Sequence, residues 1–281
     1  MKSFEVKLEG VDGTVFHVQG WEPDDEHPKA LVALIHGVGE HTGRYAHVGK
    51  ALTDAGYTLA GFDLRGHGKS GGARGHFPSL DAIMHDIRGF FKYLVGRYPE
   101  IPHFLYGHSL GGLLTLAYAL RYNNGLKGVT VSGAALRTAL QEQKMKVAMA
   151  KVLGGFVPAV TIPSGLDASA ISRDPQVVET YLRDPLVHDK TSLGLGKAVL
   201  DAIDLCFAQA KDFIPPLLIM HGKADRLTYP SGSEDFACLA REKNHDVTLK
   251  VWDGLYHEIH NEPEKGDVFH LMIEWLDARL K

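Results

Sequence analysis

Short runs of consecutive apolar residues recur along the chain and are typical of strands that are buried on both faces of a sheet. Residues 30–35 (Ala-Leu-Val-Ala-Leu-Ile) and 57–62 are the first two such runs. Near the amino end, residues 4–8 and 14–18 instead alternate polar and apolar positions around Val-Asp-Gly at 11–13, which predicts a hairpin. Further strands are predicted at 103–106, 128–132, 217–221 and 247–252.

Helical periodicity separates these strands. Ser79 has the side chain of an N-cap and precedes apolar residues at the i, i+3, i+4, i+7 spacing of one helix face. A closing helix is predicted over 267–279. Because strands alternate with helices, the pattern predicts an α/β fold: a mostly parallel sheet with helices on both faces.

The alternation stops between about residues 136 and 199. Residues 144–153 are amphipathic, 154–163 mix apolar residues with Gly and Pro, and no strand is evident in the segment. An insertion between two strands of a parallel sheet lies over their carboxyl ends, where such folds bind ligands. We therefore expect a mainly helical cap at 136–199 and a core formed by 1–135 and 200–281. The alternative is an ordinary crossover with long helices, although such connections are usually far shorter.

Composition limits the classes of function. The chain has 281 residues, a net charge of −4 and no block of basic residues, so nucleic acid is not an expected partner. Two cysteines, Cys206 and Cys238, are expected to be free and buried, which favours a reducing compartment. No apolar leader segment opens the chain and no stretch is long enough to span a bilayer. We therefore expect a cytoplasmic protein.

The clearest chemical signal is Gly107-x-Ser109-x-Gly111, which lies between the strand at 103–106 and an apolar helix from Leu110. In the nucleophile elbow of serine hydrolases, a strand-to-helix turn exposes the serine hydroxyl, and small residues on either side make room for it. Five residues with three fixed positions match by chance in many proteins. The strand before the motif and the helix after it favour the elbow.

A serine nucleophile needs a base, and the base needs an acid to orient it. Asp225 follows the strand at 217–221 and His257 follows the strand at 247–252, in the order Ser, Asp, His found with this elbow. All three residues are predicted at the carboxyl edge of one sheet. His221 and His260 compete for the role of base, and Asp253 competes for that of acid.

The oxyanion of such a reaction needs two backbone donors. Leu110 follows the nucleophile at a helix N-terminus, and Val38 lies in a Gly-rich loop after the strand at 30–35, so their N–H groups are our candidates. Three cofactor or metal motifs fail on spacing: Thr42 breaks G-x-G-x-x-G, Asp63 breaks the P-loop, and the pair His257 and His260 is one residue short of H-E-x-x-H. No metal or other cofactor is predicted.

Several segments together closely resemble the monoacylglycerol lipase family, which has the α/β-hydrolase fold. They are His-Gly-Val-Gly-Glu-His at 36–41, Phe-Asp-Leu-Arg-Gly-His-Gly-Lys-Ser-Gly-Gly at 62–72, Gly-His-Ser-Leu-Gly-Gly at 107–112, His-Gly-Lys-Ala-Asp-Arg at 221–226 and Tyr-His-Glu-Ile-His-Asn-Glu at 256–262.

The resemblance implies that monoacylglycerols are hydrolysed to fatty acid and glycerol through an acyl-enzyme. It matches Ser109, Asp225 and His257 to the triad and Val38 and Leu110 to the oxyanion donors. It also implies that Glu40, Arg44 and Tyr181 bind the alcohol end of the substrate. A lysophospholipase, a general carboxylesterase and a binding module without catalysis remain open alternatives.

The expected cap also carries a set of apolar residues, and packing against the core need not bury all of them. We expect part of this set to pack on the core and part to contact a membrane or micelle surface. The set comprises Val147, Met149, Val152, Leu153, Phe156, Val157, Val160 and Ile162.

Overall fold

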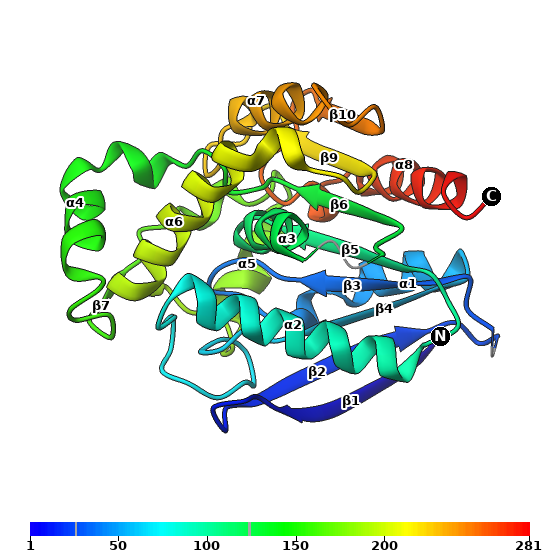
Figure 1. The fold of residues 1–281 in the computed structure, drawn as a ribbon, viewed down its shortest axis with the longest axis horizontal. Coiled ribbons are helices and arrows are strands. Elements are labelled where there is room, and N and C mark those ends of the chain that lie inside the picture. Colours follow the sequence, from blue (N-terminus) through cyan, green and yellow to red (C-terminus); the bar gives the residue numbers. More distant parts are fainter. Residues whose placement is uncertain (26, 123–124) are drawn as a thin grey trace.

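Eight strands form one sheet in the computed structural model, which describes residues 1–25, 27–122 and 125–281 (Figure 1). Their order is β1-β2-β4-β3-β5-β6-β9-β10, in which β1, β2 and β4 pair antiparallel and all later pairs are parallel. The predicted hairpin and mostly parallel sheet are therefore confirmed. The strands are β1 Lys2–Glu9, β2 Val15–Glu22, β3 Ala30–Ile35, β4 Tyr57–Phe62, β5 His103–His108, β6 Gly128–Ser132, β9 Leu217–Gly222 and β10 Val247–Trp252.

Helices cover both faces of this sheet, as the alternation of elements predicts. Every residue of β3 is buried, because alternate side chains enter the two layers. Leu31 belongs to a buried cluster that includes residues of α2, α3, α6 and α7, whereas Val32 belongs to a second cluster that includes residues of α1 and α8. These helices are α1 Ala46–Asp54, α2 Leu80–Arg97, α3 Leu110–Arg121, α6 Leu193–Gln209, α7 Pro230–Ala240 and α8 Lys265–Ala278.

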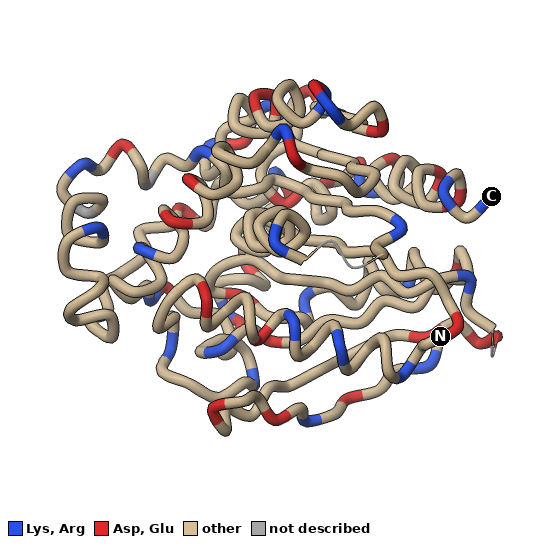
Figure 2. The backbone as a smooth tube through the Cα atoms, in the orientation of Figure 1, with Lys and Arg blue, Asp and Glu red and all other residues tan. Residues whose placement is uncertain are grey.

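Local sequence determines where these elements begin. The Ser79 hydroxyl accepts a hydrogen bond from the N–H of Ala82 at 3.1 Å, which confirms the predicted N-cap of α2. The central strands β3, β5 and β6 carry no Lys, Arg, Asp or Glu, so charge lies mainly on the outer helices and loops (Figure 2). These three central strands are therefore buried without any ion pair between them.

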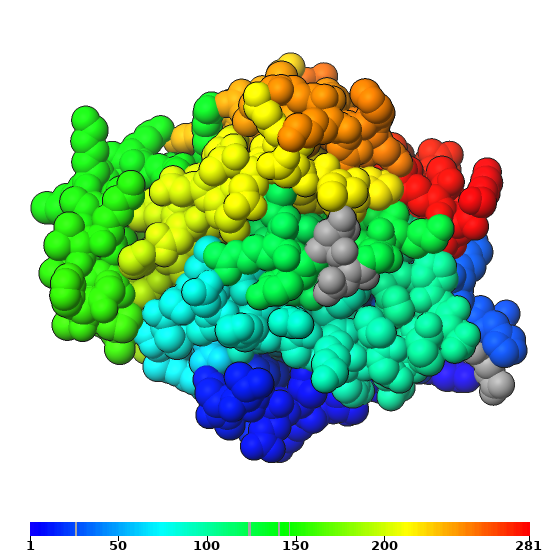
Figure 3. Space-filling view, viewed as in Figure 1, coloured from blue at the N-terminus to red at the C-terminus, as the bar shows by residue number. Residues whose placement is uncertain are grey.

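The inserted segment between β6 and α6 projects from the rest of the molecule (Figures 1 and 3). It contains two helices, as expected, but also a two-stranded antiparallel sheet that the sequence analysis did not predict. The predicted boundary after residue 199 falls inside α6, so the division into core and cap stays a prediction. The elements are α4 Lys144–Leu153, β7 Thr161–Pro163, α5 Pro175–Arg183 and β8 Lys190–Ser192.

Short 3-10 turns join several of these elements. Two of them hold residues of the candidate site: Thr42–Tyr45 follows β3, and Ile259–Asn261 follows β10. The others are Ala139–Glu142, Ala168–Ala170 and Ala210–Asp212.

Both cysteines have free thiols, but only Cys206 is buried. The expected burial of Cys238 is wrong, because this residue lies on the exposed side of α7. Within the described residues, no helix is both long and apolar enough to cross a membrane.

Candidate active site

Ser109 occupies a strained turn between β5 and α3. Its φ of 55° is the only positive value among the described non-glycine residues. A Cβ on Gly107 would overlap the Gly111 carbonyl and the Thr115 hydroxyl, and one on Gly111 would overlap the Ile35 carbonyl. These close approaches explain why glycines flank the serine, and they hold its backbone in a conformation that costs energy.

His257 and Asp225 meet in a buried hydrogen bond. His257 Nδ1 lies 2.7 Å from Asp225 Oδ2, and Thr228 Oγ1 donates to the same oxygen at 2.8 Å. Burial raises the pKa of Asp225, but His257 and a hydrogen bond from His221 outweigh it and hold this pKa well below its usual range. Asp225 is thus a buried carboxylate that orients the imidazole of His257.

The competing residues have other surroundings. His221 is fully buried and also contacts Asp225, at 3.1 Å, while its Nδ1 lies 2.8 Å from the Ser233 hydroxyl. Asp253 is exposed and pairs with Lys223.

His260 stacks against the ring of Tyr45 and is not in the cavity wall described next. Of the three histidines, only His257 both contacts the acid and faces the serine's cavity.

Ser109 and His257 line one cavity of about 190 Å³ beneath the inserted segment. The Ser109 hydroxyl makes no hydrogen bond to His257 in the described structure, and such contacts commonly tighten only when substrate binds. Apart from the reacting groups the wall is predominantly apolar. It includes Val38, Leu110, Ala135, Val147, Ala150, Ile162, Leu166, Leu193, Leu195, Gly196, Val199, Leu200 and Leu227.

The two predicted oxyanion donors also reach this cavity. Val38 lies in the loop after β3 and Leu110 opens α3, and both line the wall beside Ser109. Within the described residues, neither backbone N–H donates a hydrogen bond to another group. The positive end of α3 adds to the attraction for negative charge at this point. The arrangement suits a developing oxyanion.

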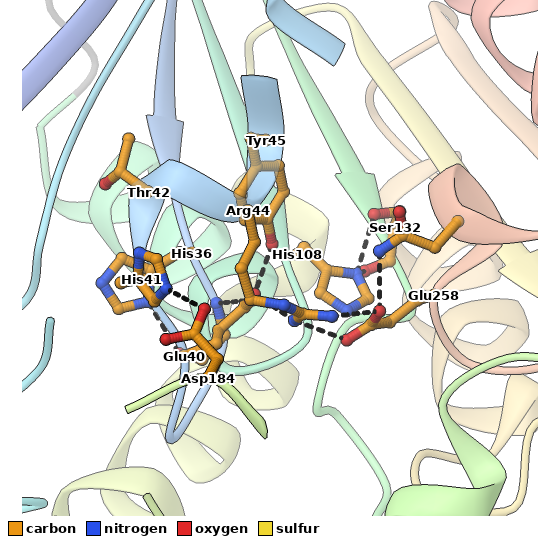
Figure 4. A network of polar contacts seen from close by, with 12 residues as sticks. His36, Glu40, His41, Thr42, Arg44, Tyr45, His108, Ser132, Asp184 and Glu258 are labelled. Carbon is orange, nitrogen blue, oxygen red and sulfur yellow. Dashed lines mark hydrogen bonds and ion pairs between the residues drawn. The ribbon is translucent and has the colours of Figure 1, made fainter. Parts of the chain in front are cut away.

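The three predicted alcohol-binding residues are not among the described residues that line the cavity. Two of them, Glu40 and Arg44, contact each other in Figure 4. Glu40 is 2% exposed and accepts hydrogen bonds from Gly37 N, Tyr45 Oη and Arg44 at 2.6 to 2.7 Å. The Arg44 guanidinium also lies 4.7 Å from the ring centre of Tyr181. Their contact with substrate stays a prediction, because all three are engaged with one another or with the protein.

Two residues near the site were missed by the sequence analysis. Thr228 contacts both Asp225 and His257, and Glu258 binds Arg44 through two hydrogen bonds of 2.8 Å. The adjacency of Glu258 to His257 is the one signal that could have marked it. No group of His, Cys, Asp and Glu side chains suited to a metal ion occurs among residues 1–25, 27–122 and 125–281.

A mostly parallel sheet with a serine at the sharp turn between a central strand and its helix defines an α/β-hydrolase. The model of the serine aminopeptidase S33 family matches residues 26–264, and the chain belongs to that family. It is 37% identical to the monoacylglycerol lipase of Mycolicibacterium smegmatis, over 98% of each chain. It is 38% identical to an abhydrolase domain-containing protein of Dictyostelium discoideum, but spans only 28% of that protein's length.

Solved structures agree with this assignment. The monoacylglycerol lipase of Paleococcus ferrophilus is 34% identical, with a TM-score of 0.83 over 99% of this chain and 100% of its own. A soluble variant of the monoglyceride lipase from Saccharomyces cerevisiae, in complex with a substrate analog, is 27% identical. Its TM-score is 0.90 over 99% of this chain and 96% of its own. The predicted fold and family are confirmed.

Proposed function

We propose that this protein is a carboxylic ester hydrolase that cleaves monoacylglycerols to fatty acid and glycerol. The observation that carries the proposal is that Ser109, His257, Val38 and Leu110 line one predominantly apolar cavity. Within the described residues, the N–H groups of Val38 and Leu110 have no hydrogen-bond partner. The monoacylglycerol lipases among the similar proteins support this substrate class.

In the proposed reaction, His257 accepts the proton of Ser109 as the serine oxygen attacks the ester carbonyl. The amides of Val38 and Leu110 stabilise the oxyanion, and each donor lowers the activation barrier by about 3 kcal/mol. His257 then protonates the departing glycerol oxygen, which leaves the acyl group on Ser109. A water molecule then gives a proton to His257 and attacks the acyl carbonyl. The bond between the acyl carbon and the Ser109 oxygen breaks, His257 returns the proton to that oxygen, and the fatty acid is released. Asp225 keeps the imidazole in the required tautomer throughout.

The cavity suits an acyl chain better than a polar group. Its wall is apolar on the sides formed by α4 and α6. An acyl chain that enters this space is removed from water, and burial of each methylene favours binding by roughly 0.8 kcal/mol. The reacting ester would then lie at the mouth of the cavity, beside Ser109.

The outer surface of α4 and of the turn after it is proposed to contact lipid. Phe156 is 84% exposed, Met145 78% and Val152 62%, whereas Val147 and Ile162 face the cavity. Residues 144–163 include three lysines and no acidic residue, so this stretch of the chain carries a net positive charge. Such a surface fits the interface of a membrane or micelle.

A fluorophosphonate probe and a substrate panel test the proposal. We expect the probe to label the protein at Ser109 and Ser109→Ala to prevent labelling. Rates should be highest for monoacylglycerol when compared with lysophosphatidylcholine and p-nitrophenyl esters. Higher rates on the lysolipid would favour a lysophospholipase, and higher rates on short esters a general carboxylesterase. A wild-type protein that is neither labelled nor active would refute the enzymatic function.

A further inference from the structure

A buried group of three charged side chains lies beside the candidate site (Figure 4). The Arg44 guanidinium lies between two carboxylates: it donates to Glu40 at 2.6 Å and to both oxygens of Glu258 at 2.8 Å. The exposed fractions of the three side chains are only 3% for Glu40, 10% for Arg44 and 4% for Glu258. The group thus holds a net charge of −1 in the interior.

This group connects three separate parts of the chain. Glu40 accepts from the N–H of Gly37 at 2.7 Å, which fixes the loop that presents Val38. Glu258 directly follows His257, and its own N–H donates to the Ile171 carbonyl of the inserted segment at 2.7 Å. Arg44 is therefore the link between the loop after β3 and the loop after β10.

Burying such a group is costly, so its retention calls for an explanation. Each ion loses hydration on burial, and an ion pair is seldom more stabilising than well-packed apolar residues of the same size. One guanidinium between two carboxylates leaves one negative charge without a partner. Asn261 Nδ2 donates to Glu258 at 2.7 Å and offsets part of that cost. What the bidentate contact supplies is a fixed geometry between the two loops.

We propose that Glu258 is a positioning residue which, through Arg44, holds the oxyanion loop in register with the segment that carries His257. The inference rests on the proposed ester hydrolysis and adds a residue to its site. The same carboxylate places a fixed negative charge near the imidazole, and this charge stabilises the imidazolium that forms during the reaction.

The electrostatic part concerns the pKa of His257. Burial lowers this pKa, but Asp225 raises it through its charge and its hydrogen bond, Glu258 and Glu40 raise it further, and the net shift is upward. The other titratable and charged groups packed around the imidazole add positive charge when protonated or are cationic. The groups that act on His257 or on its immediate neighbours are Asp225, Glu258, Glu40, Arg44, His108, His260 and His221, which shares the Asp225 carboxylate.

The pH dependence of kcat/KM on a p-nitrophenyl ester tests the proposal in the variant Glu258→Gln. The base must be neutral to accept a proton, so kcat/KM rises with pH through the pKa of His257. Removing one negative charge should move this rise to lower pH by about 0.5 to 1 unit. We also expect kcat at the plateau to fall roughly tenfold with little change in KM, because the oxyanion loop acts in the transition state.

Glu262→Gln is the matched control. This carboxylate is also buried, lies four residues further along the same segment and pairs with Arg173, away from the imidazole. Its pH profile should coincide with that of the wild type. Glu258→Asp, which keeps the charge on a shorter side chain, should retain the wild-type midpoint.

Glu40→Gln removes a charge from the other side of Arg44 and should shift the midpoint in the same direction. It provides the same readout if Glu258→Gln does not fold. The proposal is wrong if the folded glutamine variants keep the wild-type midpoint, or if Glu262→Gln shifts it equally. An inactive wild type would instead contradict the proposed function, so the two failures are distinguishable.

Discussion

At the scale of single residues, the structure concentrates its backbone strain where the proposed chemistry needs it. Ser109 is held at a φ of 55° by the turn between β5 and α3, and the glycines at 107 and 111 leave no room for a relaxed alternative. Strain of this kind costs on the order of 1–3 kcal/mol and persists only when the surroundings enforce it. The strain keeps the serine oxygen exposed to the cavity.

Asp225→Asn tests the contact between acid and base. The amide can present an N–H to Nδ1 of His257 and so favour the wrong tautomer, which we expect to lower kcat by roughly 10⁴-fold. In the wild type, the upward pKa shift of His257 predicts that kcat/KM reaches half its maximum above about pH 6.5. A stopped assay across pH 5 to 9 measures both effects.

Asp253→Asn is the control for this variant, since Asp253 is exposed and pairs with Lys223. Its activity should match that of the wild type. An active Asp225→Asn variant would contradict the assignment of Asp225 as the acid.

Some residues of the site were predictable because each follows a strand in the parallel part of the sheet. Ser109, Asp225 and His257 end up together since the carboxyl ends of parallel strands share one edge of the sheet. Glu258 was missed, because its contact with Arg44 joins positions 214 residues apart and no local pattern announces it. Pairing of charges across distant loops depends on the packed tertiary structure.

At the scale of elements, prediction succeeded where many residues share one periodicity. All six residues of β3 and of β4 are buried, and α2 begins at its predicted cap. β7 and β8 were missed because each has only three residues, too few for an alternation to be recognised. The short strands form through their pairing with each other.

Gly196 in α6 provides a test of the cavity wall as the acyl site. It lines the cavity, and a Cβ there would lie 3.2 Å from the Cβ of Ala150 in α4. Gly196→Leu should therefore narrow the space while it gains helix propensity. We expect kcat/KM for long-chain esters to fall about tenfold or more, with acetate esters nearly unaffected.

Gly89→Leu is the matched control, since this glycine is exposed on α2 and a side chain there meets open space. The ratio of long-chain to acetate rates should stay as in the wild type. Equal losses on all esters in Gly196→Leu would exclude this wall as the acyl site.

At the scale of the whole molecule, charge and apolar surface are distributed unevenly. The inserted segment projects from the body (Figure 3), and its exposed residues include Met145, Val152 and Phe156 as well as Lys144 and Lys151. Phe156→Ser combined with Val157→Ser should reduce binding to anionic vesicles at least several-fold, as measured by co-sedimentation. Hydrolysis of a water-soluble ester should remain unchanged.

Val11→Ser is the control for vesicle binding, because Val11 is 95% exposed and lies outside the inserted segment, in the turn between β1 and β2. Vesicle binding that is the same in all three proteins would show that the inserted segment does not contact lipid.

One feature of α6 has an evolutionary consequence. Leu195 and Val199 in its first half line the cavity, and Leu195 also belongs to the main core. Ile203 and Cys206 in its second half belong to that core only, with Cys206 beside the Leu113 carbonyl of α3. The helix is continuous from Leu193 to Gln209. In the proposed function, the residues that select the acyl chain are therefore not confined to one exchangeable segment. A graft of residues 136–192 from a relative would transfer only part of the cavity wall. Divergence in chain-length preference must then proceed by coordinated change in the insertion and in the body of the enzyme.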